Sequence, residues 1–236
     1  MKNKVFPVEI DDIPLKDVTS GIIDGRLNGV IVTPNVDHMC RIYSSNTFRD
    51  LYRQANLCVC DSKILQYISI LKRRRINNVV RGSDLTIDIL KECKGRKVLI
   101  VGSDENQAVK VKRIYGVSEV NLVVPSFGFI NDPDEFNALV DEISSIEWDV
   151  AFFAVGSPQQ EILAFDVLEN MDCQQRTILC CGNAINFAIG NVSRSPKWMS
   201  TIGIEWFYRM IVEPRRMIPR YFKNLMIFYY TFVRGA

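Results

Sequence analysis

"GVIVTPNVDHMCRIYSSNTFRDLYRQANLCVC", residues Gly29 to Cys60, is the stretch from which the fold can be predicted. Two short apolar runs, 29–33 and 56–60, flank a longer stretch, 34–55, whose apolar residues recur mostly three or four positions apart, as in a helix. A strand, a helix and a second strand in this order form a βαβ unit, whose strands are parallel. The stretch therefore predicts two parallel strands joined by a helix.

The same alternation continues along the rest of the chain. Short, nearly continuous apolar runs occur at 77–80, 97–102, 120–127, 150–156 and 177–182, as expected for strands that are buried on both faces. Helical patterns lie between most of these runs, for example at 84–94 and at 132–145, the latter with Asp132 as its expected N-cap. We therefore predict an α/β fold, a Rossmann-like, mostly parallel sheet with helices on both faces.

The charges divide the chain into two parts. The 236 residues include 29 lysines and arginines and 27 aspartates and glutamates, and residues 191–236 hold eight of the former and two of the latter. This final segment is therefore +6, whereas the remaining residues are −4. We predict an α/β catalytic domain over 1–192 and a basic, aromatic helical appendage over 193–236 whose partner is anionic.

The first residues and the cysteines indicate the cellular compartment of the protein. The start "MKNKVFPVEIDDIP" contains no apolar run of signal-peptide length, so a cytoplasmic location is expected. Seven cysteines show neither disulfide-framework nor zinc-pair spacing, and we interpret them as reduced core residues. Cys58 and Cys60 lie two apart on a predicted strand, so they should face the same side.

Candidate ligand-binding residues follow the predicted strands, because open α/β sheets bind ligands beyond the carboxyl ends of their strands. Glycine in such a turn permits close approach to a phosphate, although it is also the simplest way for the chain to turn into a helix. Neither GxGxxG nor GxxxxGK[ST] occurs, which argues against a dehydrogenase and a P-loop NTPase. The predicted substrate-binding residues in these turns are Arg81, Gly102, Ser103, Phe127, Gly128, Gly156, Pro158 and Gly182.

Polar residues in two of the turns are candidates for catalysis. Asp61 ends an apolar strand, where its carboxylate could accept a proton from a substrate hydroxyl or could cap a helix that starts near Ser62. Thr33 and Asn35 could hydrogen-bond a substrate or cap the next helix. The single histidine, His38, has no identifiable catalytic partner in the sequence, and we assign it to packing or polar surface.

A longer set of motifs resembles a known family. "VTPNVDH", "RGSDL", "FAVGSPQQE", "CCGNAINFAIGNVSRSPKWM" and "GIEWFYRMIVEPRRMIPRY" occur in the order and at about the spacing of the WecG/TagA/CpsF glycosyltransferases, glycosyltransferase family 26. The resemblance covers roughly residues 25–225. It implies a membrane-associated bacterial enzyme that transfers a sugar, either N-acetylmannosamine, its uronic acid or glucose, from UDP to a polyprenyl-diphosphate-linked saccharide during surface-polysaccharide assembly.

The resemblance also assigns roles to single residues. The catalytic base of the family corresponds to Asp61, and its TPN threonine and asparagine correspond to Thr33 and Asn35. The remaining matches are substrate-binding residues, namely Gln160, Arg215, Arg216 and Arg220. No metal or other cofactor and no nucleic acid is implied; "DPD" at 132–134 resembles a DxD metal motif but has the composition of a helix start. Self-association is expected from an apolar tail when no membrane is present.

Two positions depart from the family pattern. Ser62 follows the catalytic aspartate where the family usually has glycine, and Asn186 stands in a turn where the family tends to have aspartate. These departures leave open a non-catalytic, nucleotide-sugar-binding scaffold as an alternative function. A nucleotide-binding oxidoreductase on the same fold is a further alternative, disfavoured by the missing glycine fingerprint.

The residue pattern of the last segment predicts two amphipathic helices separated at Pro214. In the first helix Glu205 and Arg209 form an i, i+4 pair, and the second places Arg216, Arg220 and Lys223 on one face. Such an element either lies in a membrane interface or is a solvated helix packed on the core. Neighbouring tryptophan and tyrosine residues favour the interface, while the apolar run 225–233 is too short to span a bilayer.

Overall fold

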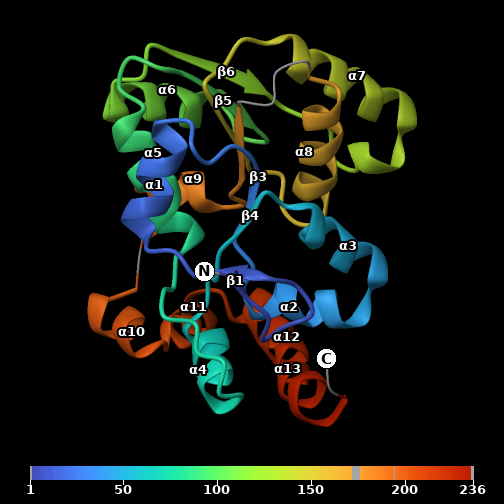
Figure 1. Cartoon of the computed structure of the whole chain (residues 1–236). Helices are drawn as coiled ribbons and strands as arrows, with labels where there is room; N and C mark the ends of the chain where they lie inside the picture. Colours follow the sequence, from blue (N-terminus) through green and yellow to red (C-terminus); the bar gives the residue numbers. More distant parts are fainter. Residues whose placement is uncertain (1, 172–175, 194, 235–236) are drawn as a thin grey trace.

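Six parallel strands form the central sheet of the computed structural model, which describes residues 2–171, 176–193 and 195–234, with the backbone alone at 197, 200, 201, 209, 216 and 234 (Figure 1). Across the sheet the strands follow the order β4-β3-β8-β7-β5-β6, and every neighbouring pair is parallel. The parallel α/β fold predicted from the sequence is therefore confirmed. The strands are β3 (Gly29–Val32), β4 (Leu57–Cys58), β5 (Lys97–Val101), β6 (Glu119–Val123), β7 (Val150–Phe153) and β8 (Thr177–Cys180).

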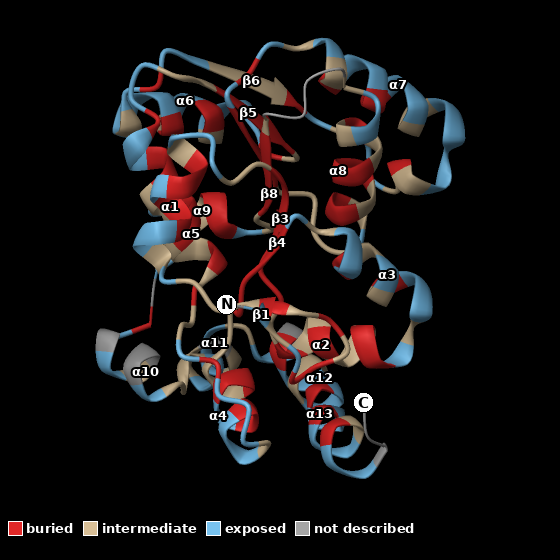
Figure 2. Cartoon of the chain, viewed as in Figure 1, coloured by how far each residue is buried: buried red, intermediate tan, exposed pale blue. Residues whose placement is uncertain are grey.

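Helices cover both faces of the sheet because successive strand residues point to opposite sides. Val30 and Val32 pack on one side, and Ile31 between them packs on the other. The first face carries α2 (Val36–Ser44), α3 (Asn46–Gln54), α7 (Pro133–Ser145) and α8 (Gln159–Glu169). The second carries α1 (Leu15–Ile23), α5 (Gly82–Glu92), α6 (Glu105–Tyr115) and α9 (Ala184–Ala188). Figure 2 shows that the strands between these two layers are almost entirely buried, except for the edge strand β6, which is mostly half-buried.

The helix predicted over 34–55 is in fact two helices. Ser45 adopts an extended conformation, with φ −129° and ψ 123°, which ends α2, and its hydroxyl accepts a hydrogen bond from the Phe48 N–H. A serine at this position is a preferred N-cap, so the chain starts a new helix in a new direction. Asp132 caps α7 as predicted, since its carboxylate accepts hydrogen bonds from the N–H groups of Asp134 and Glu135.

The predicted strand at 77–80 is wrong. This segment has no regular secondary structure, although the Val80 N–H donates to the Cys60 carbonyl at 2.8 Å. The Asp12 carboxylate accepts hydrogen bonds from the backbone and side-chain amides of both Asn77 and Asn78. A short antiparallel pair, β1 (Lys2–Asn3) with β2 (Ile10–Asp11), lies nearby, and α4 (Lys63–Leu71) follows β4. A 3-10 turn, η1 (Phe129–Asn131), precedes α7.

The C-terminal segment is helical and packs on α2. It consists of α10 (Lys197–Ile202), α11 (Glu205–Val212), α12 (Pro214–Asn224), α13 (Met226–Tyr229) and η2 (Tyr230–Arg234), so the break predicted at Pro214 is confirmed. Met217 and Ile227 are buried, and Tyr230 stacks on Tyr43 of α2 with ring centroids 5.5 Å apart. Among the described residues, no helix is both long enough and apolar enough to cross a membrane.

The six described cysteines are unpaired thiols, and Cys173 lies outside the described residues. Cys58 and Cys60 belong to the same core cluster, as predicted. Burial raises the pKa of the Cys60 and Cys93 thiols to about 12, so both are protonated at neutral pH and are poor nucleophiles.

Candidate active site

Neighbouring strands in the middle of the sheet send the chain to opposite faces. The chain leaves β3 into α2 on one face, whereas it leaves the adjacent β8 into α9 on the other. The adjacent strands β5 and β7 form a second such pair, since α6 and α8 follow them on opposite faces. Doubly wound sheets bind ligands at these topological switch points. Thr33 and Gly182 follow the first pair, and Gly102 and Gly156 follow the second.

Thr33 and Asp61 meet at the first residue of α5. A methyl group added to Gly82 would lie 2.7 Å from the Thr33 Oγ1 atom and 3.5 Å from the Asp61 Oδ2 atom. The three residues come from the ends of β3 and β4 and from the start of α5, segments far apart in the sequence. Only glycine leaves this space open, so the absence of a side chain at Gly82 shapes the surroundings of both predicted catalytic groups.

The residue that caps α4 is Ser62, not Asp61. The Ser62 hydroxyl accepts a hydrogen bond from the Leu65 N–H at 3.3 Å, and α4 begins at Lys63. The helix-capping alternative for Asp61 is therefore wrong. The hydroxyl of Ser62, the first departure from the family pattern, is bonded to its own helix.

Asn35 is the N-cap of α2, the alternative that the sequence left open. Its side-chain oxygen accepts hydrogen bonds from the N–H groups of Asp37 (3.0 Å) and His38 (3.3 Å). A catalytic role for Asn35 remains a prediction. Because its side-chain oxygen already accepts two hydrogen bonds from α2, its side-chain NH2 group is the part that could contact a substrate.

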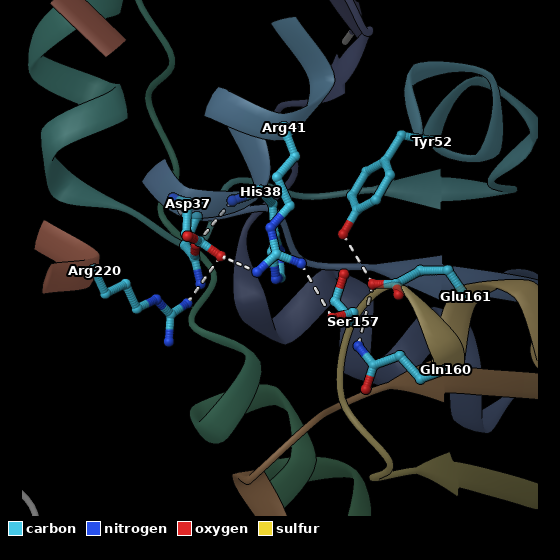
Figure 3. A network of polar contacts seen from close by, with 9 residues as sticks. Asp37, His38, Arg41, Tyr52, Ser157, Gln160, Glu161 and Arg220 are labelled. Carbon is cyan, nitrogen blue, oxygen red and sulfur yellow. Dashed lines mark hydrogen bonds and ion pairs between the residues drawn. The ribbon is translucent and has the colours of Figure 1, made fainter. Parts of the chain in front are cut away.

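An ion-pair network joins the start of α2 to two other segments (Figure 3). The Asp37 carboxylate pairs with Arg41 at 2.8 Å and with Arg220 of α12 at 3.4 Å. The Arg41 guanidinium also donates to the Ser157 carbonyl at 3.1 Å, in the turn that follows β7. Arg220, predicted to bind substrate, is thus held beside the TPN turn, although it comes from the far end of the chain.

A buried chain of hydrogen bonds lies behind the Gly182 turn (Figure 3). The Gln160 side-chain oxygen accepts from the Gly182 N–H at 3.0 Å, and the Gln160 amide donates to Glu161 at 3.2 Å. Tyr52 of α3 donates to the same Glu161 oxygen at 2.9 Å. Gln160 is only 3% exposed. It is therefore placed to fix the backbone of the Gly182 turn, and its direct contact with a substrate stays a prediction.

Asn186, the second departure, is part of a polar cluster. Its side-chain oxygen accepts from Gln107 (3.0 Å) and Asn191 (3.1 Å), and its amide donates to the Asn183 side chain at 2.6 Å. An aspartate could accept the first two hydrogen bonds but could not donate the third. The side-chain NH2 group of Asn186 is thus needed for the hydrogen bond to the Asn183 side chain.

Arg81 connects the site to the C-terminal helices. Its guanidinium lies 3.6 Å from the Glu205 carboxylate at the start of α11 and 3.6 Å from Asp84 of α5. The predicted partner of Glu205 was Arg209, whose side chain lies outside the described ones. Arg215 is exposed on α12, and the side chain of Arg216 is likewise outside the described ones.

Other predicted residues are distributed along the carboxyl edge. Gly102 has φ 89°, and a methyl group there would lie 2.4 Å from a Val155 side-chain carbon, so glycine is required where the turns after β5 and β7 meet. Ser103 is buried, Pro158 is exposed as the first turn of α8 begins, and Phe127 is fully exposed. Because β6 and β4 are opposite edges of the sheet, about 24 Å apart at the usual strand spacing, Phe127 and Gly128 are not brought together with Asp61.

A surface depression of about 440 Å³ lies at the other end of the strands. Its lining includes Lys97, Asp149 and Thr177, which precede or begin β5, β7 and β8. Ligands of this fold class bind at the carboxyl ends, so we do not assign the depression to the functional site.

The fold and the polar, glycine-containing turns together define a Rossmann-like α/β protein, a class whose ligands bind at the carboxyl edge of the parallel sheet. A comparison with protein families adds the next step. The model of the glycosyl transferase WecG/TagA/CpsF family matches residues 3–236, and the chain belongs to this family. Membership supports a glycosyltransferase of surface-polysaccharide assembly, with a nucleotide-sugar donor and a lipid-linked acceptor.

The sequence alone did not reveal several residues of this region. Asp37 and Arg41 have the i, i+4 spacing of an ion pair, which could have been noticed, whereas their contacts with Arg220 and Ser157 depend on the fold. Tyr52 and Glu161 are 109 positions apart, and no local pattern could have joined them.

Proposed function

We propose that the protein transfers a sugar from a UDP donor to a polyprenyl-diphosphate-linked saccharide, with Asp61 as the catalytic base. The Asp61 carboxylate accepts the proton of the acceptor hydroxyl, whose oxygen attacks the anomeric carbon of the sugar. The bond from that carbon to the UDP oxygen breaks, and UDP leaves with the bonding electrons. Direct attack of this kind inverts the anomeric configuration.

The observation that carries the proposal is the convergence of Thr33, Asp61 and Gly82. An oxygen nucleophile needs a base within hydrogen-bonding reach and a neighbouring group that orients it. The Asp61 Oδ2 and Thr33 Oγ1 atoms both lie close to the small opening that Gly82 leaves at a topological switch point. Because Ser62 caps α4, the Asp61 carboxylate is not required for that helix.

Charge on the departing diphosphate needs stabilisation, for which the turns offer two kinds of group. Backbone N–H groups at the starts of α6 and α8 point toward the carboxyl edge of the sheet. Arg220 is held near the TPN turn by Asp37, and a guanidinium matches phosphate oxygens in a two-pronged geometry. We propose Arg220 and Arg215 for the diphosphate of donor or acceptor.

The C-terminal helices are proposed to hold the protein at the inner face of the bacterial membrane, where the lipid-linked acceptor is. Large apolar side chains are exposed along them, including Trp198 (60%), Phe222 (77%) and Val233 (72%). Arg215 and Lys223 are exposed in the same segment. A helix with exposed aromatic residues and cations is suited to a lipid interface, where each cation contributes on the order of 1 kcal/mol near an anionic leaflet.

The test is release of UDP from a panel of UDP-sugars in the presence of a diphosphate-lipid acceptor. We expect Asp61→Asn to lower turnover by at least about a hundredfold while leaving the affinity for UDP within about threefold, because the base acts on the acceptor and not on the nucleotide. Turnover near the wild-type value would remove Asp61 from the role of base.

Asp88→Asn is a matched control, since this carboxylate lies on the same helix α5 but pairs with Lys91 and not with a predicted site residue. It should retain most of the turnover. The scaffold alternative predicts nucleotide-sugar binding without UDP release for the wild-type protein under every donor and acceptor combination.

A further inference from the structure

The turn that follows α4 carries four consecutive cations, Lys72 to Arg75. Its backbone forms the two hydrogen bonds of a Schellman motif: the Arg73 N–H donates to the Ile70 carbonyl, and the Arg74 N–H donates to the Ser69 carbonyl, both at 2.9 Å. In this motif the residue after the C-cap adopts the left-handed conformation, which favours glycine. That residue here is Arg73, with φ 55°.

The conformation of Arg73 is unusual for this chain. Each of the other ten residues with positive φ in the described ranges is a glycine. A side chain at such a position is sterically disfavoured, and residues kept in that state often serve a function that requires their side chain. The arginine at this position is therefore a reason to ask what its guanidinium contacts.

The turn is held rigidly on its inner side. The Asn3 side-chain amide donates to the carbonyls of both Arg74 and Arg75 at 3.0 Å, and the N–H of the buried Ile76 donates to the Ser69 hydroxyl at 2.9 Å. On its outer side Arg73, Arg74 and Arg75 are exposed. None of the ion pairs found among the described residues involves the four cations of this turn. The Arg74 guanidinium donates to the Lys4 carbonyl at 2.8 Å, so the exposed charge of the turn is held on a fixed backbone.

Exposed apolar side chains lie next to these cations on α4. Tyr67, Ile70 and Leu71 share one face of the helix and are 47%, 45% and 68% exposed. The Tyr67 hydroxyl donates to the Ile202 carbonyl of α10 at 3.4 Å, so this face continues onto the C-terminal segment, where Ile202 itself is 52% exposed. In Figure 1, α4 and the α12–α13 helices extend toward the same end of the molecule.

We propose that the exposed face of α4 together with the turn 72–75, here called the α4 surface, docks on an anionic lipid leaflet beside the C-terminal helices. This rests on the proposed membrane association but assigns it to a segment of the α/β domain. Cations bordering an apolar face match a leaflet, in which anionic headgroups lie above acyl chains. A symmetric contact between two copies of the surface would bring like charges together, and exposed Ile70 and Leu71 have no counterpart on a nucleic-acid backbone.

The experiment is co-sedimentation of the full-length protein with vesicles of phosphatidylcholine containing 30% phosphatidylglycerol. Arg73→Gly removes one charge and relieves the backbone conformation. We expect about fivefold weaker binding, the equivalent of roughly 1 kcal/mol, with a melting temperature equal to or above that of the wild type. Arg73→Lys retains the charge and should bind like the wild type. Leu71→Ser should also weaken binding, on pure phosphatidylcholine vesicles as well.

Arg113→Gln, which removes an exposed cation from α6, is the matched control and should not change binding. Wild-type binding by both Arg73→Gly and Leu71→Ser would overturn the proposal and leave the C-terminal helices as the membrane contact. Concentration-dependent self-association that Arg73→Gly abolishes without vesicles would assign the α4 surface to a second copy instead. Arg73→Gly should transfer sugar to a short-chain, water-soluble acceptor at the wild-type rate. Asp61→Asn should bind vesicles like the wild type. These two results separate failure of the membrane-docking proposal from failure of the catalytic proposal.

Discussion

Gly82 tests the candidate site at the scale of a single residue. In Gly82→Ala the new methyl group would lie 2.7 Å from the Thr33 hydroxyl oxygen, closer than van der Waals contact permits. Thr33 or the start of α5 must shift, and displacements of well under 1 Å reduce catalysis when groups are aligned for proton transfer. We expect kcat/KM for UDP release to fall about 10- to 100-fold.

The same substitution should leave the protein folded, because alanine is a better helix former than glycine at the first position of α5 and this offsets part of the cost of the steric clash. The melting temperature therefore separates a local steric effect from a folding defect. Ser83→Ala, at the next position of the helix, adds no atoms and should keep wild-type kinetics. Full activity of Gly82→Ala would mean that the space beside Thr33 and Asp61 is not used by substrate.

Sequence reasoning found the residues at the strand ends but not how they are used. Position after a buried strand was enough to select Thr33 and Asp61, because parallel strands end at one edge. It could not show that Ser62 caps α4 or that Gln160 is buried behind Gly182. Those facts depend on rotamers and on contacts between distant segments, about which a periodic pattern carries no information.

Helix α12 links the C-terminal segment to the α/β domain at the scale of an element. Met217 is 5% exposed, whereas the adjacent Ile218 is 53% exposed. Met217→Ala should lower the free energy of unfolding by about 2–5 kcal/mol, as expected for a cavity in a core. Ile218→Ala should change it by less than about 0.5 kcal/mol. Chemical denaturation of the two variants measures both effects.

Equal, small effects of the two substitutions would instead support a C-terminal appendage that is energetically separate from residues 1–192. The two outcomes distinguish the interpretations that the sequence left open, since an amphipathic pattern fits a core-packed helix and a lipid-bound helix alike. The structure shows features of both: Met217 and Ile227 are buried, Ile227 in the same core cluster as residues of α2, while Phe222 and Leu225 are exposed.

Most elements were predictable, and the exceptions share a cause. The helix over 34–55 has the apolar spacing of one helix, yet the hydroxyl of Ser45 satisfies the first turn of a second. The segment 77–80 has apolar residues, yet Asp12 takes the hydrogen bonds that a strand partner would take. In both places a single polar side chain replaces backbone hydrogen bonding, an outcome that local propensity does not reveal.

At the scale of the whole molecule, His38 lies where several elements meet. Its ring is near Phe48 and Tyr52 of α3, and its Nδ1 atom is buried without a hydrogen-bond partner among the described residues. Burial lowers the pKa of His38 below its usual value; Glu161 and Asp37 act in the opposite direction, and Arg41 and Arg220 add to the lowering. A positive charge on this buried ring is therefore disfavoured in the folded chain.

The consequence is a loss of global stability on mild acidification. In the unfolded chain His38 binds a proton as the pH falls below about 6.5, whereas in the folded chain it does so only at lower pH, so the free energy of unfolding should fall from pH 7 to pH 5.5 by up to about 1.4 kcal/mol per pH unit. Because the chain has a single histidine, His38→Gln removes the effect entirely, and the carboxylates that titrate at lower pH are common to both proteins. Urea denaturation at pH 7.0, 6.5, 6.0 and 5.5 should give a declining free energy for the wild type and a nearly constant one for His38→Gln. Parallel curves for the two proteins would contradict this prediction. They would mean that protonated His38 gains a compensating interaction, for which the carboxylate of Glu161, with one oxygen that accepts no hydrogen bond from the described residues, is the candidate.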